Sequence, residues 1–158
     1  MDTTKLHDSY RAFLDAAAGD DRETLVPPPG EWNADQILAH VSLISSATVA
    51  AVASVGAGTV ATYDNRLAHD PWTMERVIAL AGGSAGLRER IRRQGEALCA
   101  LGDSALSEAE LDTVFPTLLL SNGKLRFDQA VALRDIFTGV AEMELPGHTQ
   151  QLLALLPA

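Results

Sequence analysis

Two polar residues interrupt an apolar stripe near the end of the chain, and their types could do chemistry. Steps of three or four positions from Leu133, Phe137 and Val140 lead to Glu144 and then to His148. Residues four apart on a helix lie on the same face, roughly 5–6 Å from each other, so a carboxylate and an imidazole at this spacing could bind one ion. Glu-x-x-x-His is a common spacing, and by itself it fits an ordinary ion pair equally well.

His40 is the candidate third ligand, because it adjoins the apolar face of a predicted helix. A single core histidine needs no functional explanation, since histidine is buried with intermediate frequency. Together with Glu144 and His148, however, it completes a set of two imidazoles and one carboxylate. In catalytic zinc sites such a set leaves one coordination position open for water or substrate. We therefore expect a divalent metal, with zinc favoured, at His40, Glu144 and His148.

Four long helices in a single domain, residues 1–158, are expected to position these ligands. Apolar residues at helical spacing predict helices over about 3–18 and 33–55, a third from near Trp72 and a last one from near Asp128. Asn33 stands where an N-cap is expected, and Gly82-Gly83 should bend or interrupt the third helix. The simplest architecture is an all-α, antiparallel four-helix bundle, which places metal sites between facing helices.

Two segments between the predicted helices are expected to roof a cavity over the metal. Residues 56–71 contain Gly, Asn and Asp and indicate a loop, in which His69 should be solvated rather than act as a further ligand. The other roof segment is residues 114–125; within residues 114–127, Ser121-Asn122-Gly123-Lys124 predicts a turn or a small hairpin.

Charge and composition exclude several classes of function. The chain has 12 Lys and Arg against 21 Asp and Glu, a formal charge of −9, which argues against a surface that binds nucleic acid. Residues 36–63 carry no charge and are long enough to span a bilayer, but their many Ser, Thr and Gly residues favour a buried helix and no membrane. A single cysteine excludes an internal disulfide, and the N-terminal residues lack the apolar core of a signal peptide. We expect a cytoplasmic protein.

Two motifs resemble a known family. Trp32-Asn33-Ala34-Asp35-Gln36-Ile37-Leu38-Ala39-His40 is similar to the start of the second helix in the DinB/YfiT-like superfamily. Glu144-Leu145-Pro146-Gly147-His148 resembles the Glu-x-x-x-His of its mycothiol-dependent maleylpyruvate isomerase branch, and the likeness, which includes Asn65, spans nearly the whole chain. The resemblance implies a DinB-like bundle, the metal ligands His40, Glu144 and His148, usually zinc, and often a thiol cofactor. Mycothiol is implied by the resemblance alone.

Pro146 and Gly147 depart from an ideal helix between two of the expected ligands. A proline inside a helix removes one hydrogen bond and kinks the axis. We expect such a kink, which could turn His148 away from Glu144.

These observations favour a metal-dependent, thiol-dependent transferase or isomerase that acts on a small-molecule substrate. One alternative is a metal-free cyclase or isomerase that uses the bundle cavity, with Glu144 and His148 as catalytic acid and base. Another is a bundle that binds a ligand or a partner without catalysis, in which the polar triad is a hydrogen-bonded network. A homodimer is compatible with any of the three.

Overall fold

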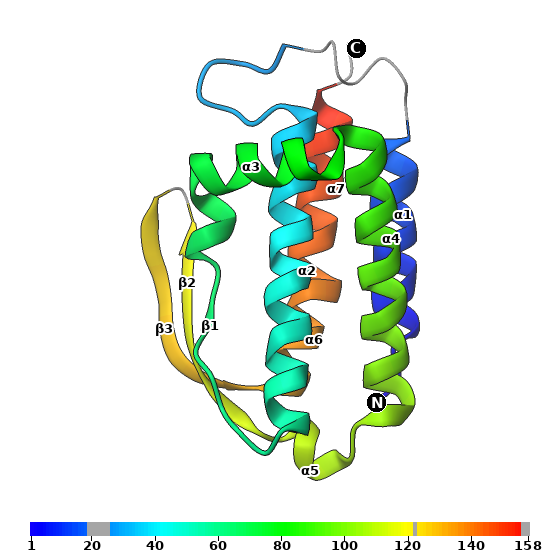
Figure 1. Cartoon of the computed structure of the whole chain (residues 1–158), viewed down its shortest axis with the longest axis vertical. Helices are drawn as coiled ribbons and strands as arrows, with labels where there is room; N and C mark the ends of the chain where they lie inside the picture. The colour runs from blue at the N-terminus through cyan, green and yellow to red at the C-terminus, as the bar shows by residue number, and fades with distance from the viewer. Residues whose placement is uncertain (19–25, 122, 156–158) are drawn as a thin grey trace.

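The computed structural model describes residues 1–18, 26–121 and 123–155 (Figure 1). Its α-helices are α1 (Thr4–Ala17), α2 (Ala34–Gly56), α3 (Pro71–Ala81), α4 (Ser84–Ala100), α5 (Glu108–Leu111), α6 (Leu133–Gly139) and α7 (Leu145–Ala154). The shorter turns are the 3-10 helix η2 (Arg66–His69) and the π-helical turns η3 (Leu101–Ala105) and η4 (Val140–Glu144). The strands are β1 (Tyr63–Asp64), β2 (Val114–Ser121) and β3 (Lys124–Ala132).

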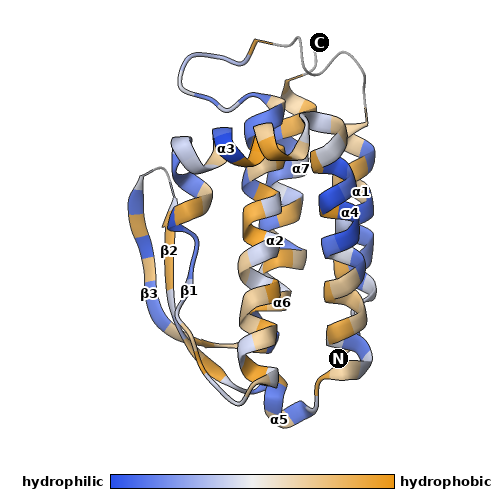
Figure 2. Cartoon of the chain, viewed as in Figure 1, coloured by the Kyte–Doolittle hydropathy of each residue, from blue (hydrophilic) through white to orange (hydrophobic). Residues whose placement is uncertain are grey.

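The helices α1, α2, α4 and the continuous run α6–η4–α7 lie side by side, and α3 crosses one end of them (Figure 1). α2 packs against α4 and α7, and α1 packs against the same two helices. Fully buried side chains from all of these elements fill the space between them, among them Phe13, Leu38, Ile91, Phe137 and Leu152. Figure 2 shows that α4 carries many hydrophilic residues, whereas α2 carries few, as its central position requires.

The second helix begins where the sequence predicts. The Asn33 side chain accepts a hydrogen bond from the Gln36 N–H, and the Gln36 side chain accepts one from the Asn33 N–H, which is a capping box. By length and composition alone α2 could cross a membrane, a test that buried core helices also pass. In the structure most of α2 is buried, and Ser45 and Thr48 give their hydroxyl protons to carbonyls one turn back.

The predicted interruption at Gly82-Gly83 is confirmed. Gly82 adopts a left-handed conformation, with φ of 79°, and closes α3, while Gly83 with φ of 85° precedes α4. A residue with a Cβ would be strained at either φ, so the glycine pair allows the chain to turn from α3 into α4.

A small three-stranded sheet corrects the expectation of an all-α fold. β1 pairs with β2 in parallel, and β2 pairs with β3 in antiparallel register from Val114↔Ala132 to Ser121↔Lys124, with a bulge at Leu119/Leu120. The last helix therefore begins at Leu133, not near residue 128, because residues 124–132 use their main-chain groups to pair with β2. The segment expected as a loop, 56–71, likewise holds β1 and η2.

Candidate metal centre

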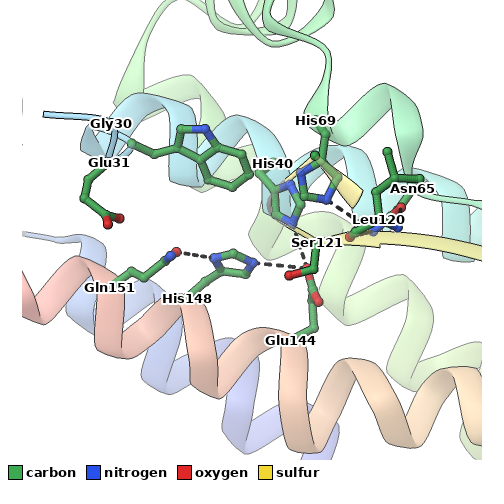
Figure 3. Close-up of a pocket in the computed structure, with 12 residues that line it drawn as sticks. Gly30, Glu31, His40, Asn65, His69, Leu120, Ser121, Glu144, His148 and Gln151 are labelled. Carbon is green, nitrogen blue, oxygen red and sulfur yellow. Dashed lines mark hydrogen bonds and ion pairs between the residues drawn. The ribbon is translucent and has the colours of Figure 1, made fainter. Parts of the chain in front are cut away.

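The three predicted ligands converge between α2 and the η4–α7 run (Figure 3). Nε2 of His40 lies 2.7 Å from Oε1 of Glu144, and Nε2 of His148 lies 3.1 Å from the same oxygen. One ligand atom from each residue lies within 4.8 Å of the others, so the cluster could hold a metal ion. His40 is 1% exposed, whereas Glu144 and His148 are half-buried. The cluster is thus fixed on the α2 side and more accessible on the side of α7.

Each imidazole of the cluster is oriented through its other nitrogen. Nδ1 of His40 lies 2.7 Å from the Ala68 carbonyl oxygen, and Nδ1 of His148 lies 2.6 Å from Oε1 of Gln151. Both partners are acceptors, so each Nδ1 carries the proton and donates it. In the neutral rings both Nε2 atoms therefore point their lone pairs toward Glu144. A metal-bound histidine is oriented by an acceptor on its other nitrogen in the same way.

The charges at the cluster favour a cation between the side chains. Burial alone would raise the pKa of Glu144, but the hydrogen bonds and the positive charge that His148 and His40 supply when Nε2 is also protonated outweigh it and lower the pKa well below its ordinary value. Glu144 is therefore ionised at neutral pH. Two imidazole lone pairs facing a carboxylate oxygen repel one another unless a proton or a cation lies among them.

The π-helical turn η4 explains why Pro146 does not separate Glu144 from His148, contrary to the expected displacement. The Leu145 N–H bonds the Val140 carbonyl five residues back. The next bond of that pattern would run from residue 146 to the Ala141 carbonyl, but proline has no N–H.

A hydroxyl from another helix supplies the missing donor. Oγ of Ser9, on α1, donates to the Ala141 carbonyl oxygen over 2.7 Å. Pro146 then lies in the first turn of α7, where proline is well tolerated. A wide turn at this point, which is common at functional sites, keeps both ligands on one face.

His69 also lies at the cluster, which corrects the expectation of a solvated loop residue. Its ring centroid lies 4.9 Å from that of His40 in an edge-to-face arrangement, and the side chain is half-buried. Burial lowers the pKa of His69, and the neighbouring His40 lowers it further. His69 is therefore neutral at neutral pH.

Asn65 connects His69 to the end of β2. Its Oδ1 accepts the Leu120 N–H at 2.7 Å, and its Nδ2 lies 3.1 Å from the Leu120 carbonyl oxygen and 3.3 Å from Nε2 of His69. An amide nitrogen only donates, so Nε2 of His69 accepts and the neutral ring carries its proton on Nδ1. The buried Asn65 side chain thus extends the β1–β2 pairing and fixes the wall of the site.

A cavity of about 390 Å³ opens beside the cluster. Both predicted roof segments contribute to it, with Asn65 and His69 from one and Leu120, Ser121 and Gly123 from the other. Trp32 completes the wall on the α2 side, with its ring centroid 4.8 Å from that of His40 and 6.2 Å from that of His148. The roof expected from the sequence is confirmed in these residues.

Sequence reasoning identified the three cluster residues but missed the side chains that orient them. Gln151 stands three residues after His148, a spacing that places both on one helix face, so the pattern could have revealed it. His69 gave no periodic signal, because it lies on a short 3-10 turn whose position depends on the sheet.

Comparison with known proteins adds no relative. No protein-family model matches the chain, and neither curated proteins nor solved structures give a match. Membership of the DinB/YfiT-like superfamily therefore stays a prediction from the sequence. What the chain does has to be inferred from the geometry of His40, Glu144 and His148 and of the cavity beside them.

Proposed function

We propose that His40, Glu144 and His148 bind one divalent metal ion, zinc, and that the chain is a metal-dependent enzyme for a small-molecule substrate. The observation that carries this proposal is the orientation of the two imidazoles. Ala68 and Gln151 accept the Nδ1 protons, so both Nε2 lone pairs meet the ionised carboxylate of Glu144.

Zinc fits this donor set. Imidazole nitrogen and carboxylate oxygen are its ordinary protein ligands, and three of them leave a position for a fourth. The cavity of about 390 Å³ lies on the open side of the cluster, where His148 and Glu144 are half-buried. When bound, the ion would lower the pKa of a thiol or a water in that position and so supply a nucleophile at neutral pH.

The reaction class that we propose is thiol-dependent transfer or isomerisation. Trp32 and His69 give the cavity aromatic walls, and His69, being neutral, adds no positive charge that would pair with the thiolate. The sequence resemblance supports a low-molecular-weight thiol such as mycothiol, and a DinB-like four-helix bundle formed by α1, α2, α4 and α6–α7. Cytoplasmic location, a homodimer and the absence of nucleic-acid and membrane partners remain predictions from the sequence.

The test is a thiol-consumption assay with zinc as the variable. Wild-type protein is stripped with a chelator, reloaded with zinc, and incubated with mycothiol, glutathione or cysteine and a small electrophile. We expect thiol loss that needs zinc, that disappears in His40→Ala and that survives in His7→Ala, a matched change of an exposed histidine on α1.

Two results would contradict the proposal in different ways. If the zinc-loaded protein consumes no thiol but hydrolyses an ester, the nucleophile is water and not a thiol. Isomerisation of the substrate that continues after chelation would favour the metal-free alternative, in which Glu144 and His148 act as acid and base.

A further inference from the structure

A second cavity, of about 440 Å³, lies between α2, the β2–β3 hairpin and the α6–η4 run. Its walls are mostly apolar side chains from all of these elements, including Ile44, Leu119, Phe127, Val131, Ile136 and Val140. Among the described residues that line it, the charged ones are Arg126, Asp135 and Glu144. Arg126 and Asp135 are exposed and opposite in sign, so the rim does not favour one net charge.

The buried hydroxyl groups at this cavity already have partners in the protein. Thr48 gives its hydroxyl proton to the Ile44 carbonyl, so the Tyr63 hydroxyl donates to Thr48 over 3.1 Å. Thr117 donates to the Phe115 carbonyl. A ligand inside the cavity would therefore meet apolar surface and few unpaired hydrogen-bonding groups, which suits an apolar group.

This apolar cavity adjoins the one at the metal centre. Asn65, Leu120, Ser121 and Glu144 line both. Glu144 thus faces the polar cavity with its carboxylate while its neighbours Val140 and Met143 line the apolar one. Met143 is 76% exposed and stands at the open side.

We propose that the apolar cavity is the subsite for the apolar part of the substrate, whose polar reacting group lies at His40, Glu144 and His148. The substrate class is an amphipathic small molecule with an aliphatic chain or an uncharged ring. The position of the reacting group rests on the proposed function, whereas the apolar subsite rests on its own walls. Its volume falls in the usual range for small-molecule pockets.

Gly139 offers a way to fill this subsite without touching the metal ligands. It is the last residue of α6 and lines the cavity, and a Cβ built on it meets no atom within 4 Å. Gly139→Leu should therefore fold and occupy the cavity. Gly56→Leu is the matched control, because a Cβ there is also unobstructed but Gly56 is exposed at the end of α2.

The experiment measures binding by calorimetry with two series of probes. Zinc-loaded protein is titrated with acetohydroxamate, hexanohydroxamate and octanohydroxamate, whose heads chelate the metal. Metal-free protein is titrated with butanol, hexanol and octanol, which need no metal. In both series we expect affinity to rise by about fourfold per methylene group, the equivalent of about 0.8 kcal/mol, until the cavity is full. Gly139→Leu should abolish this dependence, and Gly56→Leu should keep it.

The two series separate the failure of the subsite from the failure of the metal centre. Hydroxamates that bind without dependence on chain length, with alkanols that do not bind, would overturn the subsite and leave the metal centre intact. If zinc does not bind, the alkanol series decides alone. An alkanol affinity that rises with chain length in the wild type but not in Gly139→Leu supports the subsite. An alkanol affinity that does not change with chain length in the wild type overturns it. Dependence that persists in Gly139→Leu would also overturn it.

Discussion

Replacing Ser9 by alanine should destabilise the protein through the turn that carries Glu144. The Ser9 hydroxyl supplies the donor that Pro146 cannot give to the Ala141 carbonyl. An intramolecular hydrogen bond contributes about 1 kcal/mol net to stability. Removing its donor and leaving this part-buried carbonyl unpaired should therefore cost about 1 kcal/mol in all. For a protein of this size we expect Ser9→Ala to lower Tm by about 2–4 °C.

A double-mutant cycle tests the physical reason, by urea unfolding of metal-free protein. In Pro146→Ala the new N–H at residue 146 can bond Ala141, so adding Ser9→Ala should then cost much less than in the wild type. The expected coupling is about 1 kcal/mol. Ser104→Ala is the control, since the Ser104 hydroxyl donates to the Ala100 carbonyl over 3.3 Å at an exposed position on η3, where water can take its place. An equal cost of Ser9→Ala in both backgrounds would refute the reasoning.

Three further predictions concern the cluster and its surroundings. Gln151→Ala should weaken zinc affinity by about 10–100-fold, because His148 loses the acceptor that orients it. A competition titration with a chromophoric chelator measures this affinity, and Gln150→Ala, a change of an exposed neighbour, should leave it unchanged. In metal-free protein the lowered pKa of Glu144 stabilises the fold fully above the pKa of an unfolded carboxyl, about 4.3, and this stabilisation is lost as the pH falls toward the folded pKa. Urea unfolding at a series of pH values should therefore show that the free energy of unfolding of wild type exceeds that of Glu144→Gln by less in acid. A difference that stays constant with pH would contradict this prediction. Asn65→Asp keeps an acceptor for the Leu120 N–H but loses the donors to the Leu120 carbonyl and His69. The free energy of unfolding should therefore fall by about 1–3 kcal/mol. An unchanged Tm would contradict the claim that Asn65 fixes the wall of the site.

Features with a local physical cause could be predicted from the sequence. Asn33 begins α2 because its side chain satisfies an end N–H, and Gly82-Gly83 ends α3 because glycine tolerates a positive φ. The face of the last helix that holds Glu144 and His148 followed from spacing. These features depend on neighbours in the sequence.

The turn residues indicated a small hairpin, but its extent to Ala132 and the residues that it positions could not be predicted in the same way. Residues 124–132 contain Asp128, Gln129 and Ala130, which are weak strand formers, and they are extended because β2 pairs with them. His69 and Asn65 reach the site only because β1 pairs with β2, which brings residue 65 beside Leu120. The effect of Pro146 also depended on a distant residue, Ser9 on α1.

The most direct test of the metal centre is elemental analysis of protein purified without a metal-affinity tag. Wild type, His148→Ala and the exposed-histidine control His7→Ala are compared after incubation with zinc and removal of the excess. We predict about one zinc per chain in wild type and in His7→Ala, as one three-ligand site requires, and loss of that zinc in His148→Ala. Wild-type protein that retains no metal, or His148→Ala that retains as much as wild type, would contradict the assignment of His40, Glu144 and His148 as a metal centre.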